Sequence, residues 1–283
     1  MHRLKIDINR LRLLIPVAIW AVVLFPGLTK CQNLDVPYVP TPKAVVEGML
    51  DIANVQPCDY VIDLGSGDGR IVIAAAKRGA FAHGIDLDPE RISEARENAA
   101  NAGVTDHVMF KRENIFTTDF SQATVVTMYL LPSVNKKIRT KLLDRLEPGT
   151  RIVSHSFDMG EWEPDKRVTV DDNGGSMHEI YYWIIPAKVE GTWQWSSDGI
   201  NFSMTARQNF QNISLTLSDD GGSSYNIKEA LLQGKRISIW AKNGTHNYVF
   251  SGEIAENHIH GILQNHNGDD KNFESWEATK IED

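Results

Sequence analysis

Cysteine is scarce in this chain. Only two of the 283 residues are cysteine, and Cys31 and Cys58 stand in neither a C-x-x-C pair nor a zinc-binding spacing. The sequence therefore contains no disulfide framework and no cysteine-based metal site. An excess of basic residues is also missing, because the net charge is −8 at pH 7. This charge argues against a nucleic-acid backbone as the main partner, and we expect no nucleic-acid partner.

A complete dinucleotide fingerprint is missing as well. Residues 61–70 read V-I-D-L-G-S-G-D-G-R, so an apolar strand ends at Asp63 and a glycine-rich turn leads into an apolar helix over 71–77. Arg70 stands where the third glycine of the NAD or FAD fingerprint belongs, which argues against those two cofactors. Glycines still let the backbone approach a nucleotide-sized ligand at the carboxyl end of a parallel strand.

A second acidic residue follows at the spacing that a ribose requires. About 21 residues after Gly65, the predicted strand 81–85 ends at Asp86, whose carboxylate can accept hydrogen bonds from both ribose hydroxyls. The turn and the two strand ends resemble the nucleotide-binding region of class I S-adenosyl-L-methionine (SAM)-dependent methyltransferases. That resemblance implies SAM as the cofactor, with the glycine turn at its methionine part and Asp86 at its ribose.

The same resemblance assigns further residues to the cofactor. Leu87 would pack on the adenine. Asn114 stands where the family has an acidic residue that binds the adenine amino group, and an Asn carbonyl oxygen can still accept that hydrogen bond. Asp68 and Arg70 would contact the turn or brace it. The expected cofactor-binding residues are Tyr38, Thr41, Asp63, Gly65, Ser66, Gly67, Asp86, Leu87 and Asn114.

A proline-rich segment narrows the resemblance. Residues 36–42 read V-P-Y-V-P-T-P, and with D-L-G-S-G-D-G-R at 63–70 they resemble the membrane-anchored mitochondrial protein-lysine methyltransferases and their bacterial relatives. The similarity covers roughly residues 36–185. It implies that Tyr38 and Thr41 close over the cofactor and that the acceptor is a protein lysine. Prolines that only stiffen a linker are the alternative.

Alternating strand and helix patterns over residues 32–186 predict an α/β fold, a Rossmann-like doubly wound sheet. Its last two strands, on either side of the turn 172–175, predict a closing antiparallel hairpin, as class I methyltransferases have. Residues 187–283 carry short strand patterns separated by turns, which predict a small antiparallel β barrel or sandwich domain. The strands expected in the first domain are 60–64, 81–85, 107–111, 123–131, 150–154, 168–170 and 178–185.

The N-terminus combines basic and apolar residues. Four basic residues precede an apolar run from Leu13 to Leu28, whose length lies between those of a signal peptide and a transmembrane helix. We expect residues 1–31 to be a signal peptide or transmembrane anchor, with membrane association through residues 13–28 or export. Positive charges ahead of one span place the domain outside, whereas SAM is made inside cells. The side of the membrane stays open.

The catalytic candidates follow the fourth and fifth predicted strands. Residues 128–132 read M-Y-L-L-P where many adenine and glutamine N-methyltransferases have Asn/Asp-Pro-Pro-Tyr/Phe, which argues against those acceptors. Tyr129 would line the methyl-transfer region or belong to the core. His155 and Asp158 would orient the acceptor, take its proton, or satisfy backbone groups of their loop.

Two histidines near the C-terminus form a separate pattern. His258 and His260 would share one face of a strand, and His266 lies nearby in the sequence. No third ligand follows at a fixed spacing, so the sequence predicts no metal site.

These features predict a SAM-dependent methyltransferase that methylates an acceptor nitrogen, with a protein lysine as the first assignment. Two alternatives stay open. The acceptor of the enzyme could be a small molecule or a lipid, which a membrane-proximal N-terminus would suit. Alternatively, the chain could be an inactive methyltransferase fold that serves as a binding protein at the cell envelope.

Overall fold

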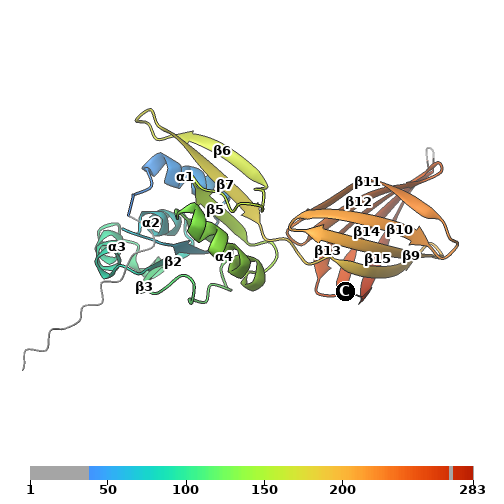
Figure 1. Ribbon diagram of the computed structural model, residues 1–283, viewed down its shortest axis with the longest axis horizontal. Helices are drawn as coiled ribbons and strands as arrows, with labels where there is room; N and C mark the ends of the chain where they lie inside the picture. Colours follow the sequence, from blue (N-terminus) through green and yellow to red (C-terminus); the bar gives the residue numbers. More distant parts are fainter. Residues whose placement is uncertain (1–37, 268–269, 283) are drawn as a thin grey trace, which may run out of the picture. The chain divides into compact units, whose positions relative to one another are not determined.

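The computed structural model describes residues 38–267 and 270–282. These residues form a mixed β-sheet packed against helices, and a β barrel (Figure 1). The predicted signal or anchor segment, residues 1–31 with the apolar run 13–28, lies outside these described residues. Within the described ranges, no helix combines the length and the apolar character needed to cross a membrane.

The first sheet has seven strands in the order β3-β2-β1-β4-β5-β7-β6. The five strands β1 to β5 run parallel, and β7 pairs antiparallel with both β5 and β6. This mixed sheet confirms the Rossmann-like plan with its closing hairpin. The strands are β1 (Tyr60–Leu64), β2 (Phe81–Asp86), β3 (Val108–Arg112), β4 (Val125–Met128), β5 (Arg151–His155), β6 (Lys166–Asp171) and β7 (Met177–Ile184).

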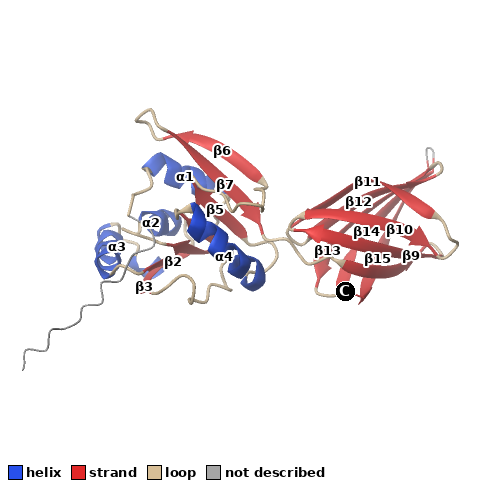
Figure 2. Cartoon of the chain, viewed as in Figure 1, coloured by secondary structure: helices blue, strands red, loops and turns tan. Residues whose placement is uncertain are grey.

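Helices cover both faces of this sheet (Figure 2). One apolar cluster joins helices α1 to α3 to one face, and a second joins α4 to the other. Along β1, Val61 belongs to the first cluster, whereas Ile62 and Leu64 belong to the second, as expected for a central strand buried on both sides. The helices are α1 (Lys43–Ile52), α2 (Arg70–Lys77), α3 (Pro89–Asn101) and α4 (Pro132–Arg145), with a 3-10 turn η1 (Thr105–His107).

Two of the differences between the predicted and the observed strand boundaries affect the candidate site. The apolar run 123–131 gives a strand only over Val125–Met128, because Pro132 starts α4 and the residues before it form the connecting loop. The fifth strand ends at His155 rather than before it. His155 is therefore a buried strand residue, not a loop residue beyond the strand.

The second sheet is a closed antiparallel barrel of eight strands in the order β10-β11-β12-β13-β14-β15-β8-β9. Aromatic side chains fill its interior, among them Trp193, Trp195, Phe202, Phe250 and Trp276, as expected where eight strands leave room only for side chains. The prediction of a small all-β domain is confirmed. Of the two forms left open, a barrel or a sandwich, the closed strand order shows the barrel. The strands are β8 (Gly191–Ser197), β9 (Ile200–Asn209), β10 (Asn212–Asp219), β11 (Ser224–Gln233), β12 (Arg236–Asn243), β13 (His246–Ala255), β14 (His258–Asn267) and β15 (Asp270–Glu282).

Candidate active site

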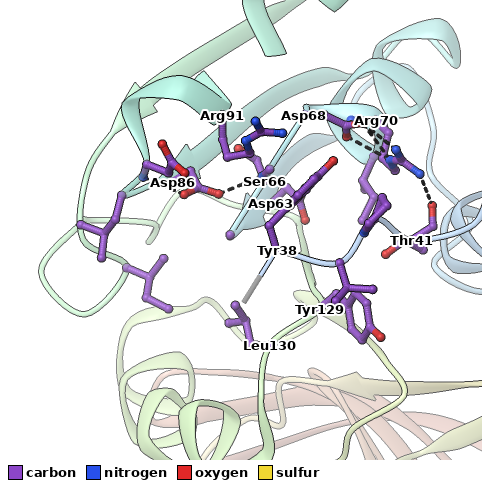
Figure 3. Close-up of a pocket in the computed structure, with 18 of the residues that line it drawn as sticks. Tyr38, Thr41, Asp63, Ser66, Asp68, Arg70, Asp86, Arg91, Tyr129 and Leu130 are labelled. Atoms are coloured by element: carbon purple, nitrogen blue, oxygen red, sulfur yellow. Dashed lines mark hydrogen bonds and ion pairs between the residues drawn. The ribbon is translucent and has the colours of Figure 1, made fainter. Parts of the chain in front are cut away.

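A pocket opens at the carboxyl ends of β1, β2 and β4 (Figure 3). The order β3-β2-β1-β4-β5 changes direction between β1 and β4, and open α/β sheets bind ligands at such a switch point. The pocket brings together all nine residues expected to bind the cofactor, although their contact with it stays a prediction. The lining residues used below are Tyr38, Thr41, Asp63, Gly65, Ser66, Gly67, Asp68, Arg70, Asp86, Leu87, Arg91, Asn114, Tyr129, Leu130 and Val134.

Two glycines of the turn after β1 stand where a side chain would not fit. Gly65 and Gly67 have φ angles of +82° and +52°, a region that L-residues with side chains rarely adopt. A Cβ atom on Gly67 would lie 2.5 Å from the Tyr38 ring, and one on Gly65 would lie 2.8 Å from Leu130 Cδ2. The turn therefore presents bare backbone to the pocket, which suits close contact with a ligand.

The Asp86 carboxylate is held in place by two backbone groups. Gly67 N donates to Asp86 Oδ2 and Asp88 N donates to Asp86 Oδ1, each at 2.9 Å. Asp88 in turn caps α3, because its side chain accepts from Glu90 N at 2.8 Å. The carboxylate thus sits at the end of β2 in one fixed orientation, with lone pairs left to accept from a diol.

Two further polar groups fit a bound nucleotide. The Ser66 hydroxyl is buried without a hydrogen-bond partner among the described residues, and buried hydroxyls normally have one. Asn114 Oδ1 accepts from Phe116 N at 2.9 Å and has a second lone pair for an amino group. With Asp86 and the bare glycine turn, these groups fit SAM.

Asp63 is almost completely buried at the end of β1, with 2% of its surface exposed. Burial raises the pKa of its carboxyl to about 7, and the hydrogen bond from Thr127 opposes this rise. That bond runs from Thr127 Oγ1 to Asp63 Oδ1 at 2.7 Å. Thr127 lies on β4, next to Asp63 in the parallel register, and sequence reasoning missed it because the contact joins strands far apart in the chain.

Arg70 connects the segment before α1 to the glycine turn. Its guanidinium pairs with the Asp68 carboxylate at 2.6 Å and donates to the Thr41 carbonyl oxygen at 2.7 Å (Figure 3). Arg91 stacks over the Tyr38 ring, 4.7 Å from its centroid. These contacts hold Tyr38 and Thr41 against the pocket, and their closing over the cofactor stays a prediction.

Replacing Arg70 with alanine should weaken cofactor binding by about tenfold. A charged hydrogen bond contributes about 1.5–3 kcal/mol, and part of this free energy supports cofactor binding because it keeps the segment at Thr41 ordered. Arg70→Lys should recover little, since an ammonium group cannot reproduce the fork-shaped contact. Calorimetric titration with S-adenosyl-L-homocysteine (SAH) measures the change, and Arg207→Ala, in the barrel, is the control. Equal affinity in Arg70→Ala and wild type would contradict this role.

The three catalytic candidates do not all reach the pocket. Tyr129 lines it, whereas neither His155 nor Asp158 is among its lining residues. His155 is fully buried behind Tyr129, with the two ring centroids 3.9 Å apart. Asp158 Oδ1 accepts from Gly160 N at 3.0 Å. A catalytic role for these residues stays a prediction.

His155 lies between two partners from other elements. Its Nδ1 is 3.2 Å from Thr41 Oγ1 and its Nε2 is 2.9 Å from Nδ1 of His178 on β7. Burial lowers the pKa of His155 to about 4, with the neighbouring His178 adding to the effect. The imidazole is therefore neutral at pH 7. Sequence reasoning missed His178, because only the antiparallel pairing of β5 and β7 brings the two rings together.

Similarity to known proteins identifies the family. The profile of the ANTKMT methyltransferase domain matches residues 63–166. The chain is 47% identical over 152 residues to a protein-lysine N-methyltransferase of Saccharolobus islandicus (strain REY15A), an alignment that covers 53% of this chain and 94% of that protein. The chain belongs to this methyltransferase family. It is a SAM-dependent methyltransferase, and SAM is its cofactor.

Two other similar proteins extend the comparison. The methyltransferase is 36% identical over 148 residues to the adenine nucleotide translocase lysine N-methyltransferase of Mus musculus, covering 52% of this chain and 64% of that one. It also matches a crystal structure described as an RNA methyltransferase from Salinibacter ruber in complex with SAH. That match has 53% identity and a TM-score of 0.50, and it covers 53% of this chain and 96% of the other.

Proposed function

We propose that this enzyme transfers the methyl group of SAM to the ε-amino nitrogen of a lysine in a protein. The observation that carries the proposal is the apolar and aromatic wall beside the glycine turn, formed by Tyr129, Leu130 and Val134. An amide or nucleobase acceptor needs polar partners there, whereas the alkyl stem of a lysine packs on apolar surface while its amino group projects beyond it. The 47% identical protein-lysine N-methyltransferase supports the same acceptor class.

The lining residues divide the pocket between the two substrates. Asn114 and Leu87 hold the adenine end, Asp86 accepts from the ribose, and the turn at Gly65 and Gly67 faces the methionine part. When bound, SAM supplies an electrophilic methyl group on a sulfonium. The residues of the pocket must hold the acceptor nitrogen in line with the sulfur–methyl bond and keep this nitrogen unprotonated.

We assign His155 a positioning role. It does not line the pocket, but it contacts the Tyr129 ring on one side and the Thr41 hydroxyl on the other. Because its imidazole is neutral at pH 7, it adds no positive charge beside an amine that must lose a proton. Through Thr41 and His178, it also connects the pocket wall to Asp172, whose carboxylate is 3.5 Å from His178 Nε2.

Tyr129→Ala should lower kcat/KM for the acceptor by about tenfold to a hundredfold, because the lysine stem loses the aromatic surface on which it packs. The affinity for SAH should change by less than about threefold, since the cofactor rests mainly on backbone and carboxylate groups. Tyr129→Phe keeps the ring and is the matched variant. A loss of activity as large in Tyr129→Phe as in Tyr129→Ala would show that the hydroxyl matters more than the surface.

Radiolabelled SAM tests the acceptor class directly. The enzyme is incubated with an extract of cells that lack it, and label is measured separately in protein, RNA and lipid. We expect label in protein, and methyl-lysine after acid hydrolysis. Label confined to RNA, as the name of the Salinibacter ruber structure would suggest, or confined to lipid or small molecules, would refute the proposal. No label in any fraction and no SAH binding would favour the inactive binding protein instead.

Membrane association or export through residues 13–28 belongs to the same proposal, and its support is the apolar composition of that run. We propose that the segment places the enzyme beside an acceptor protein at a membrane. Fractionation of cells that express the full chain, or the chain without residues 1–31, tests this assignment. An identical distribution of both forms would refute it.

A further inference from the structure

Two histidines and a glutamate meet on the outer face of the barrel. His258 and His260 are two residues apart on β14, and their side chains are 49% and 57% exposed, whereas Ile259 between them is buried in the interior. The antiparallel register pairs His260 directly with Glu277 on β15, and residues paired in this way project from the same face. The third residue that the sequence pattern lacked is therefore supplied by the neighbouring strand.

The three side chains converge on one point. Glu277 Oε1 is 3.6 Å from Nδ1 of His258 and 3.6 Å from Nδ1 of His260. One possible ligand atom from each of the three residues lies within 4.8 Å of the other two, and the two rings are stacked with centroids 5.8 Å apart. A separation of 3.6 Å is too long for a hydrogen bond. It is close to the separation of about 3.4 Å between ligands of a tetrahedral ion with bonds near 2.1 Å.

We propose that His258, His260 and Glu277 form a binding site for one divalent transition-metal ion, with Zn²⁺ as the first choice. Two imidazole nitrogens and one carboxylate oxygen suit Zn²⁺, Ni²⁺ and Cu²⁺, whereas Mg²⁺ and Ca²⁺ prefer sites built from oxygen alone. The high exposure of all three side chains leaves a fourth position for water.

The surroundings favour a cation. On the other side of His260, the register pairs it with Glu253 on β13, so carboxylates flank this imidazole on both neighbouring strands. Glu253 faces Arg236, with Nε and Oε1 3.5 Å apart, which balances part of its charge. The site rests on the regular ladder between β14 and β15, and ligands on rigid strands need little reorganisation to bind an ion.

Calorimetric titration of the untagged full chain with ZnCl₂ tests the proposal. We expect one Zn²⁺ per chain, and His258→Ala or His260→Ala should lower the affinity by about tenfold or more, because each removes one of three ligands. Glu277→Gln should have a smaller effect in the same direction. His107→Ala removes an exposed histidine outside the barrel and should leave the affinity unchanged.

The outcomes separate this site from the methyltransferase pocket. None of the three ligands lines that pocket, so His260→Ala should bind SAH as the wild type does. Zn²⁺ affinity that is equal in wild type, His258→Ala and His260→Ala would overturn the proposal, as would no Zn²⁺ binding at all. Absorption bands of tetrahedral Co²⁺ that appear with the wild type and disappear in His260→Ala would support it independently.

Discussion

Replacing Asp86 with alanine should lower the affinity for SAM by about a hundredfold. The carboxylate is the group placed to accept from the ribose, and each hydrogen bond to a charged group contributes about 1.5–3 kcal/mol. Alanine also removes the two contacts by which Asp86 holds the amides of Gly67 and Asp88. The glycine turn and the start of α3 would then lose part of their fixed position, so the ligand would pay an ordering cost as well.

Titration of the same variant with SAH measures the effect, because SAH shares the ribose with SAM. Asp86→Asn is the sharper companion, since it keeps an acceptor oxygen but exchanges the second one for a donor. We expect it to lie between alanine and wild type. Asp106→Ala, an exposed acidic residue in η1, should bind SAH normally. Wild-type affinity in Asp86→Ala would disprove the ribose assignment.

The cofactor half of the pocket could be predicted because its signals are local. The strand ending at Asp63, the glycine turn and the cap at Asp88 before Pro89 follow one another within 27 residues, and each demands a particular backbone conformation. In the structure, φ is positive at Gly65 and Gly67, and Asp88 caps the helix that begins at Pro89. A local motif of this kind fixes the backbone conformation of its own residues, so its structure can be predicted from a single sequence.

The barrel shows where local signals mislead. Strand β11 reads S-Y-N-I-K-E-A-L-L-Q over Ser224–Gln233, and this sequence pattern alone does not predict a strand. Lys, Glu, Ala and Leu are good helix formers, and Ile227 is the one β-branched residue in this segment. Pairing with β10 and β12 determines the conformation of β11. Residue propensities do not include such contacts between strands, so they cannot predict this strand.

The missed site residues share one physical cause. Thr127, His178 and Glu277 each act on a residue of a neighbouring strand, through the pairs β4 with β1, β7 with β5, and β15 with β14. The partners are far apart in the chain or have no fixed spacing, so register alone brings them together. The same limit applies to His155, which is buried at the end of β5 and is not among the residues that line the pocket.

Asp63 should make SAM binding depend on pH. Its carboxyl has a pKa of about 7 without ligand, because burial disfavours the charged form. It is therefore mostly protonated at pH 6 and ionised at pH 8. SAM carries positive charge, so it binds better to the ionised form and must displace a proton at the lower pH. We expect the dissociation constant to rise about tenfold between pH 8 and pH 6. Among the described residues, no histidine lines the pocket, so no neutral-to-cationic imidazole there competes with this effect.

Calorimetry in buffers of different ionisation enthalpy counts the protons, and we expect about one released per SAM bound at pH 6 and none at pH 8. Asp63→Asn keeps an acceptor for the Thr127 hydroxyl but cannot titrate, so its weaker affinity should no longer follow this pH profile. Thr127→Val removes the hydrogen bond that lowers the Asp63 pKa, so the midpoint should move to higher pH. A wild-type profile retained in Asp63→Asn would show that another group titrates. Loss of the profile in Asp63→Asn, together with a higher midpoint in Thr127→Val, would place the charge that SAM recognises on a buried carboxylate at the end of β1.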